Sequence, residues 1–166
     1  NTKPGRNNAD RLLCVSMKIY LIRHAEAQEA HPDAARRLTP KGQEQARRVG
    51  KFFKRTEPKV TVFSSPLVRA RESAEAIGTP VILEWLAEGA LPADLIQTVK
   101  SFDAEGAFAF VGHQPGLGHL LGTLIGSPPF DLKKGAVAMV KFEGAIAPGH
   151  GQLGLMITPK TLEALL

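Results

Sequence analysis

The most informative residues of this chain are an arginine and a histidine at the end of a short apolar run. Residues 19–25 read I-Y-L-I-R-H-A, so Arg23 and His24 follow a β-type segment directly. An imidazole at a strand end can act as a nucleophile, and the guanidinium beside it can hold the anion that it attacks. The pair therefore indicates chemistry on an anionic group.

Two further apolar runs end in the same way. The segment S-S-P-L-V-R-A-R-E-S-A places Arg69 in the first turn of a helix that begins near a proline, and F-A-F-V-G-H-Q-P ends on His113. The carboxyl ends of parallel strands form the binding sites of open α/β sheets. We therefore expect both side chains to meet Arg23 and His24 at one edge of a sheet.

The order of four motifs resembles that of a known family. R-H-A, L-T-P-K-G-Q-E-Q-A, S-S-P-L-V-R-A-R-E-S-A and V-G-H-Q-P follow one another as in the histidine phosphatase superfamily, whose fold is shared with cofactor-dependent phosphoglycerate mutases. The small size and the R-H-A-E-A opening are most similar to the SixA-type phosphohistidine phosphatases. The resemblance covers about residues 18–166. It implies a three-layer α/β/α fold with a mostly parallel central sheet and an antiparallel edge strand.

Phosphoryl transfer requires neutralisation of an anionic substrate and in-line positioning. Arg23 and Arg69 offer forked donors for the phosphate, and His113 can donate one more. A neutral His24 can attack phosphorus through one ring nitrogen while a backbone carbonyl fixes the tautomer through the other. Water then hydrolyses the phosphohistidine. We expect no cofactor and no metal, because the sequence has no H-x-x-x-H or carboxylate pair with metal-ligand spacing.

The general acid is the least defined member of the predicted site. An alkoxide leaving group needs a proton as its bond breaks. Glu88 in L-A-E-G-A lies where many members of the superfamily place that acid, while Glu84 and Asp94 are alternatives. The SixA type has no obvious acid, so none of these is required. Ala25 departs from the more familiar R-H-G form, which matters only if the backbone needs a positive φ there.

The predicted activity is that of a metal-independent phosphatase acting on phosphohistidine in a protein. A small-molecule phosphomonoesterase or mutase is the alternative if Glu88 acts as an acid. A non-catalytic phosphate- or phosphoprotein-binding module is a third interpretation. The expected partner is accordingly a phosphorylated protein or a small phosphate, and the sequence carries no signal for the oligomeric state.

Apolar periodicity predicts alternating strands and helices, which is typical of a largely parallel sheet. The predicted strands cover residues 18–23, 59–64, 80–84, 107–112, 136–142 and 151–157. The predicted helices cover residues 40–55 after Thr39 as N-cap, a segment from Ser65-Pro66 to about Ile77, residues 92–102, a segment from His113 to Gly126, and residues 159–165. The last two strands, joined by a Gly/Pro-rich turn, indicate an antiparallel hairpin at the sheet edge.

A glycine-rich segment, G-L-G-H-L-L-G over residues 116–122, resembles a dinucleotide fingerprint. Its spacing is one residue too long, and no acidic strand end follows at the expected distance. We interpret the glycines as positions where the fourth helix packs closely on the sheet. His119, within this apolar segment, is expected to be a partly buried structural residue.

Length and composition fit one globular domain. The chain has 166 residues, of which 43% are apolar, and we expect a single domain over residues 17–166. Residues 1–16 are polar and predicted to be a leader or a vector-derived segment outside the fold. The single cysteine, Cys14, excludes an internal disulfide, which favours a reducing, cytoplasmic setting. No segment has the length and apolarity of a membrane span.

The charge distribution suggests an anionic partner. The formal net charge is +5, and residues 36–71 hold eleven Lys or Arg against Glu44 and Glu57 only. A solvated helix face explains most such runs, and steering of an anionic substrate or an acidic protein is the functional interpretation. Nucleic acid binding is not expected, because no aromatic stacking platform accompanies the basic residues. His31 is expected to border the pocket.

Overall fold

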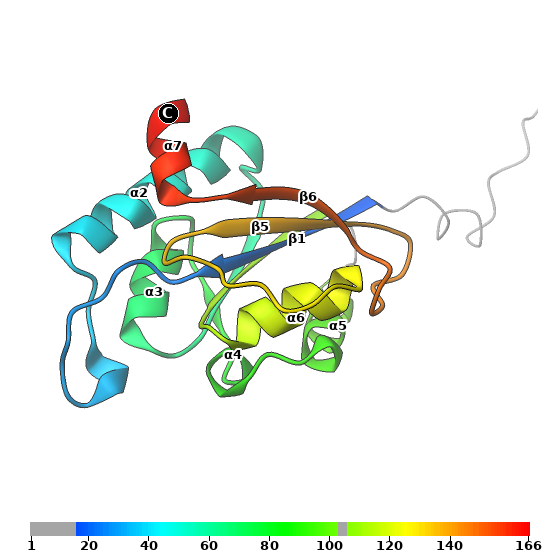
Figure 1. The fold of residues 1–166 in the computed structure, drawn as a ribbon, viewed down its shortest axis with the longest axis horizontal. Coiled ribbons are helices and arrows are strands. Elements are labelled where there is room, and N and C mark those ends of the chain that lie inside the picture. The colour runs from blue at the N-terminus through cyan, green and yellow to red at the C-terminus, as the bar shows by residue number, and fades with distance from the viewer. Residues whose placement is uncertain (1–15, 103–105) are drawn as a thin grey trace, which may run out of the picture.

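The computed structural model describes residues 16–102 and 106–166, which form a six-stranded sheet with helices on both faces (Figure 1). The strands are β1 (Ser16–Arg23), β2 (Thr61–Ser64), β3 (Val81–Ile82), β4 (Gly106–Gly112), β5 (Val137–Glu143) and β6 (Gln152–Ile157). Their order across the sheet is β3-β2-β4-β1-β5-β6. Strands β1 to β4 pair in parallel, whereas β5 runs antiparallel to β1 and β6 antiparallel to β5. The predicted fold class is confirmed.

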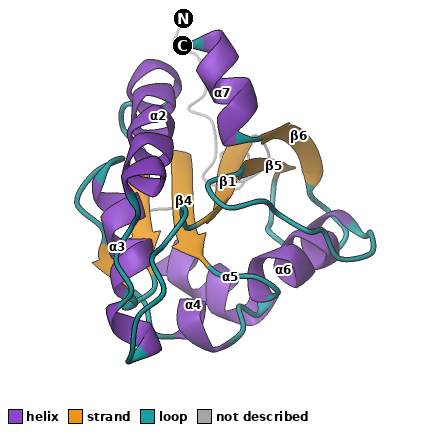
Figure 2. Cartoon of the chain, turned by 60° about the vertical axis from the view of Figure 1, so that its left-hand side comes forward, coloured by secondary structure: helices purple, strands orange, loops and turns teal. Residues whose placement is uncertain are grey.

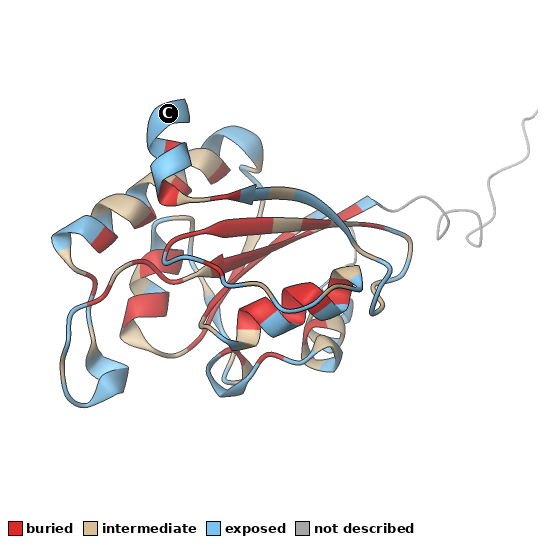
Figure 3. Cartoon of the chain, in the orientation of Figure 1, coloured by how far each residue is buried: buried red, intermediate tan, exposed pale blue. Residues whose placement is uncertain are grey.

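Two sets of helices cover the two faces of this sheet (Figure 2). One face carries α2 (Pro40–Thr56), α3 (Val68–Glu75) and α7 (Pro159–Leu165), and the other carries α4 (Trp85–Glu88), α5 (Pro92–Ser101) and α6 (Gly116–Ile125). Side chains alternate between faces along a strand. In β1, Ile19 and Leu21 accordingly join one core, and Tyr20 and Ile22 join the other. Burial is concentrated on the central strands and on the sheet-facing side of α6 (Figure 3).

Helix α2 begins as the sequence predicts. The side chain of Thr39 accepts a hydrogen bond from the Gly42 N–H at 3.0 Å, and Pro40 occupies the first turn. The buried face includes Ala46 and Val49, with Phe53 one turn further on. The apolar face of the helix therefore packs against the sheet, and the helix N-terminus faces the segment that follows β1.

The region around β3 and α3 differs from the prediction. Strand β3 has only two residues, because Glu84, the N-cap of α4 (Trp85–Glu88), already has a helical backbone (φ −59, ψ −40). Helix α3 begins at Val68 rather than at Ser65, because the backbone of Leu67 is still extended (φ −68, ψ 137). The helix also ends at Glu75, before Ile77. Arg69 nevertheless lies in its first turn, as expected.

The predicted antiparallel hairpin at the sheet edge is confirmed, because β5 and β6 pair antiparallel and β6 forms the edge. The boundary of the predicted leader needs a small correction. Ser16, expected in the leader, belongs to β1 and pairs with Glu143. Cys14 and the rest of the predicted leader lie outside the described residues. No helix in the described ranges is long and apolar enough to cross a membrane.

The glycines of α6 serve a contact other than the predicted one. A Cβ on Gly118 would lie 1.9 Å from the carbonyl oxygen of Phe130, and one on Gly122 would lie 2.7 Å from that of Pro128. The close neighbour is therefore the loop after the helix, not the sheet. The expected partial burial of His119 is wrong, because this side chain is exposed. Leu117 and Leu120 face the core, whereas His119 lies on the opposite face of the helix.

This contact predicts that Gly118→Ala lowers the free energy of unfolding by about 1–3 kcal/mol, the usual cost of overpacking, because the methyl group would collide with a backbone carbonyl. Urea denaturation followed by circular dichroism measures it. Gly116→Ala is the matched control, since its Cβ would approach no atom closer than 3.4 Å and a helical alanine gains about 1 kcal/mol over glycine. Equal stability of the two variants would contradict the packing argument.

Candidate active site

His24 lies immediately after β1, and its ring is held in one tautomer. Its backbone N–H donates to the carbonyl of Gly112 at 3.0 Å, which ties it to the end of β4. Its Nδ1 lies 2.7 Å from the carbonyl oxygen of Ala25, an acceptor only, so Nδ1 carries the hydrogen. The Ala25 N–H in turn donates to Ser73 Oγ on α3 at 3.0 Å. Nε2 is therefore left with a lone pair, as a nucleophilic nitrogen requires.

The surroundings keep this imidazole uncharged. His24 is only 7% exposed, and burial, together with a smaller effect of nearby cationic groups, lowers its pKa to about 3. The hydrogen bond to the Ala25 carbonyl acts in the opposite direction but does not overcome burial. Nε2 is consequently unprotonated across the physiological pH range.

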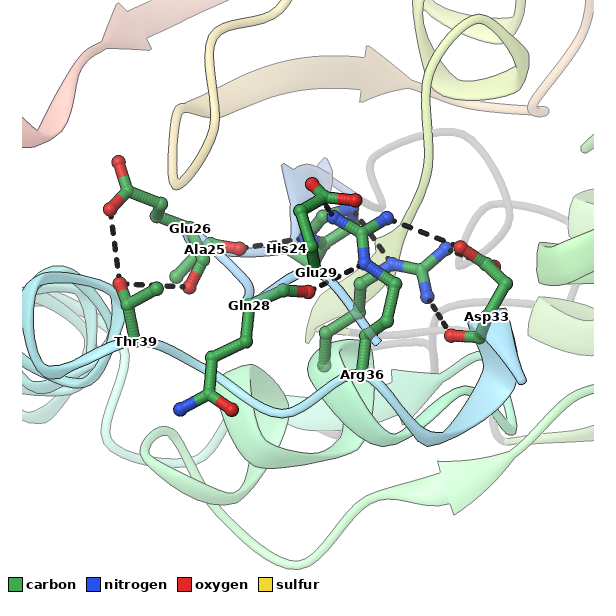
Figure 4. A network of polar contacts seen from close by, with 9 residues as sticks. His24, Ala25, Glu26, Gln28, Glu29, Asp33, Arg36 and Thr39 are labelled. Atoms are coloured by element: carbon green, nitrogen blue, oxygen red, sulfur yellow. Dashed lines mark hydrogen bonds and ion pairs between the residues drawn. The ribbon is translucent and has the colours of Figure 1, made fainter. Parts of the chain in front are cut away.

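Arg69 contacts His24 and a residue that the sequence did not point to. Its Nε lies 3.3 Å from His24 Nε2, while Nη1 donates to the backbone carbonyl of Asp33 at 2.9 Å and Nη2 to the Asp33 carboxylate at 3.0 Å. Asp33 opens the short 3-10 helix η1 (Asp33–Ala35) in the loop before α2. Arg36 also donates to this carboxylate, at 3.2 Å (Figure 4). No motif marks Asp33, because only the folded loop brings it to Arg69.

The contacts of Asp33 keep its side chain ionised. Hydrogen bonds from Arg36 and then from Arg69 lower the pKa of the Asp33 carboxyl below its ordinary value. A carboxylate of this kind orients a guanidinium well, but it is a poor proton donor at neutral pH. Asp33 thus fits the role of a partner that holds Arg69 in place.

Arg23 is anchored from the opposite side of the site. Its Nη1 donates to the carbonyl of Leu132 at 2.8 Å, in the loop between α6 and β5. Its Nε is buried and has no hydrogen-bond partner among the described residues. Burial also lowers the pKa of this guanidinium. A buried donor without a partner is costly, and the described residues leave Arg23 Nε in this state.

His113 completes the group that the sequence predicts. Its ring centroid lies 5.0 Å from that of His24. Its Nε2 lies 2.6 Å from Ser65 Oγ, whereas its buried Nδ1 has no partner in the described parts of the chain. Burial and then Arg69 lower the pKa of His113 to about 4. The structure therefore brings four of the five predicted site residues together.

Glu88 is placed nearby but not in contact with this cluster. It ends α4 and lines a cleft of about 480 Å³ that His113 and the exposed His119 also line. Its side chain is exposed. The two alternative acids, Glu84 and Asp94, are not among the described residues that line this cleft. Of the three carboxyl groups considered from sequence, only that of Glu88 belongs to a described residue lining this cleft.

Three of the six basic residues of α2 pair with acidic side chains. Arg47 and Arg48 pair with Glu44, and Lys41 pairs with Glu26. These exposed pairs agree with the solvated helix face considered above. A groove of about 740 Å³ between α2 and α3 is larger than the cleft beside His113, but none of the predicted site residues lines it. His31 is exposed two residues before Asp33.

The described residues contain no group of three or more His, Cys, Asp or Glu side chains arranged for a metal ion. The side chains at the site are instead two arginines and two histidines, which suit an anion. The absence of a metal requirement remains a prediction.

The six-stranded sheet with helices on both faces is an α/β fold of the phosphoglycerate mutase-like kind. A family model described as histidine phosphatase superfamily, branch 1, matches residues 19–91. This span contains Arg23, His24 and Arg69. Over these residues, which are fewer than half of the chain, the sequence is similar to the histidine phosphatase superfamily. No curated protein matches it by sequence.

Solved structures extend the likeness over most of the chain. The protein histidine phosphatase SixA complexed with tungstate is 22% identical, with a TM-score of 0.77 over 88% of this chain and 99% of that one. A candidate phosphohistidine phosphatase SixA from Nakamurella multipartitia is 24% identical, with a TM-score of 0.75 over 87% and 96%. A phosphoserine phosphatase mutant from Entamoeba histolytica, in complex with phosphoserine, is 18% identical, with a TM-score of 0.69 over 90% and 100%. At these identities the likeness shows the fold.

The buried neutral imidazole predicts a pH dependence of stability. The pKa of His24 is about 3 in the folded chain, against 6.5 ordinarily, so between these values the unfolded chain binds more protons and stability falls as pH falls. His24→Gln should lose less unfolding free energy than the wild type between pH 7 and pH 4. Urea titrations at several pH values measure this, with His150→Gln at an exposed position as the control. Parallel curves for wild type and His24→Gln would contradict burial of a neutral ring.

Proposed function

We propose that this protein is a phosphatase that transfers a phosphoryl group to His24 and then to water, without a metal ion, and that its substrate is phosphohistidine in a protein. The observation that carries the proposal is the state of His24: a buried, neutral imidazole whose Nδ1 is bonded to a carbonyl and whose Nε2 faces Arg69. The match of residues 19–91 to the histidine phosphatase superfamily supports phosphatase activity. The single cysteine favours a cytoplasmic setting.

The proposed reaction has two steps. His24 Nε2 attacks phosphorus, the bond from phosphorus to the leaving group breaks, and the proton on Nδ1 stays in its hydrogen bond to the Ala25 carbonyl. Arg23, Arg69 and His113 donate to the equatorial oxygens as charge redistributes. Water then attacks the phosphohistidine, which releases phosphate and returns the Nε2 lone pair. In the structure the Arg69 Nε–H donates to His24 Nε2 at 3.3 Å, so this donor must turn to the phosphate before the Nε2 lone pair can attack.

The state of the carboxyl groups supports phosphohistidine as the substrate. The carboxylate in contact with the cluster, that of Asp33, is held ionised by its arginine partners and so is a poor acid. The P–N bond of phosphohistidine is labile, and its imidazole leaving group can take a proton before departure. Such a substrate depends less on an enzymatic acid than an ester does. The SixA structures that share the fold belong to proteins named for this activity.

A small phosphomonoester is the second candidate substrate. The observation that favours it is Glu88, which lines the same cleft as His113 and could reach an alkoxide leaving group. A phosphoserine phosphatase shares the fold over 90% of this chain. The two candidates differ in what they require of Glu88, which makes them separable by kinetics.

The mechanism predicts a covalent phosphoenzyme. Rapid acid-free quenching after mixing with a radiolabelled phosphoramidate should capture label on the wild-type protein that is stable to base and lost in acid, as expected of phosphohistidine. His24→Ala should carry no label and lose turnover by at least about a thousandfold, the scale of nucleophile removal. His150→Ala, at an exposed position, should behave as the wild type. Turnover that disappears with a chelator and returns with a divalent ion would contradict the proposed chemistry.

The substrate class is tested by comparing kcat/KM for a phosphohistidine protein with that for small phosphomonoesters. We expect a higher kcat/KM for the phosphohistidine protein. Glu88→Gln should slow ester cleavage by about a hundredfold, typical of a lost general acid, and phosphohistidine cleavage much less. Glu84→Gln, outside the cleft, is the matched control.

Three other outcomes have distinct meanings in this comparison. Faster turnover of an ester, with equal damage from Glu88→Gln on both classes, would replace the proposal with a general phosphomonoesterase. Phosphate binding without any turnover would indicate a binding module. If Glu84→Gln matches Glu88→Gln, the assignment of Glu88 is wrong.

A further inference from the structure

Ser65 is a buried residue next to the cluster that the proposed mechanism does not yet use. It is 0% exposed and directly follows β2. Its backbone N–H donates to the carbonyl of Val111 at 3.0 Å, which fixes it beside the end of β4. Its side chain lies between two elements of the site. Oγ is 2.6 Å from His113 Nε2 and accepts from the Leu67 N–H, at the start of α3, at 3.3 Å.

Counting hydrogens shows which way the contact between Ser65 and His113 runs. A neutral imidazole has one N–H, and a serine hydroxyl has one hydrogen and two lone pairs. One lone pair of Ser65 Oγ accepts from Leu67. If His113 Nε2 carried the hydrogen, the hydroxyl hydrogen would have no acceptor among the described residues, and Nδ1 would present a lone pair to a phosphate. If the hydroxyl donates to Nε2, both problems disappear, and Nδ1 carries the hydrogen.

We propose that Ser65 is a positioning residue: its hydroxyl donates to His113 Nε2 and so leaves Nδ1–H as the ring's donor to the transferring phosphoryl group. The inference rests on the proposed function for the identity of that group. It accounts for the buried Nδ1 that has no partner among the described residues, since the substrate supplies the acceptor. The low pKa of His113, about 4, agrees with a ring that stays neutral.

The Ser65 hydroxyl also connects His113 to the helix that carries Arg69. Leu67 is the N-cap residue of α3, and Arg69 lies two residues further along this helix. Ser65 therefore joins the start of the helix that carries Arg69 to the ring of His113. Ser64 provides a matched comparison, because it is equally buried but its hydroxyl donates to the Ser65 carbonyl at 2.9 Å and touches neither donor.

The direct test needs no variant of Ser65. Two-dimensional ¹⁵N–¹H correlation spectra of the wild-type protein, with His113 assigned by His113→Gln, report which ring nitrogen carries the hydrogen. We expect the Nδ1–H tautomer near pH 7. An Nε2–H tautomer would overturn the proposal. This measurement uses no turnover, so it is independent of whether the phosphatase proposal holds.

Variants then test the role in anion binding, with orthovanadate as the probe. Ser65→Ala should mix the tautomers of His113, weaken vanadate binding about tenfold and lower kcat/KM by about 10–100-fold, the usual range for a residue that orients another at a site. Ser65→Thr keeps the hydroxyl and should restore most of the binding. Ser64→Ala should leave the tautomer and vanadate affinity unchanged, whatever it costs in stability.

Two results would contradict this role. If Ser65→Ala and Ser64→Ala lose the same stability and neither changes vanadate affinity, Ser65 is only a packing residue. If Ser65→Ala is too unstable to study, an Nε2–H tautomer in the wild type still overturns the proposal, and an Nδ1–H tautomer supports it. Normal vanadate binding without turnover of any phosphate would contradict the proposed function and leave the role of Ser65 intact.

Discussion

The site depends above all on the hydrogen bond between His24 Nδ1 and the carbonyl of its neighbour Ala25, at 2.7 Å. The bond is local in sequence, but it is useful only because the Ala25 peptide is itself held. Its N–H donates to Ser73 Oγ, and Ser73 donates to the Arg69 carbonyl at 2.7 Å within α3. One chain of hydrogen bonds thus links the tautomer of His24, the proposed nucleophile, to the helix that carries Arg69. A shift of α3 would disturb both at once.

Concentrating cations around a neutral histidine carries a cost that the fold offsets locally. Arg69 and Arg23 are each bonded to backbone carbonyls from separate loops, and Arg69 also meets the Asp33 carboxylate. These acceptors satisfy the guanidinium N–H groups in place of water. None of them is a carboxylate in contact with His24. The partner of Arg69 comes from a surface loop, since the side chain of Asp33 is 64% exposed. The arrangement keeps donors oriented while leaving positive potential for a phosphate.

The sheet order explains why these groups meet. Strand β4 lies between β2 and β1, so Ser65, His113 and His24 follow three adjacent parallel strands at their carboxyl ends. Backbone hydrogen bonds from His24 to Gly112 and from Ser65 to Val111 continue the ladder past the strands. The three side chains are therefore attached to the buried central strands, which hold them rigidly in place.

The sequence by itself determined the class of the fold and the residues of the cluster, whereas only the tertiary structure decided which groups hold them. Apolar periodicity located β1 and β4. Because the carboxyl ends of parallel strands lie at one edge of a sheet, the sequence also predicted that the arginines and histidines of the cluster would meet. Asp33 instead reaches Arg69 across 36 positions, and Ser65 reaches His113 across 48. The spacing of the α6 glycines predicts packing on the sheet, yet a loop carbonyl fills that space. Periodicity encodes only local geometry, while side-chain direction and loop path depend on what packs alongside.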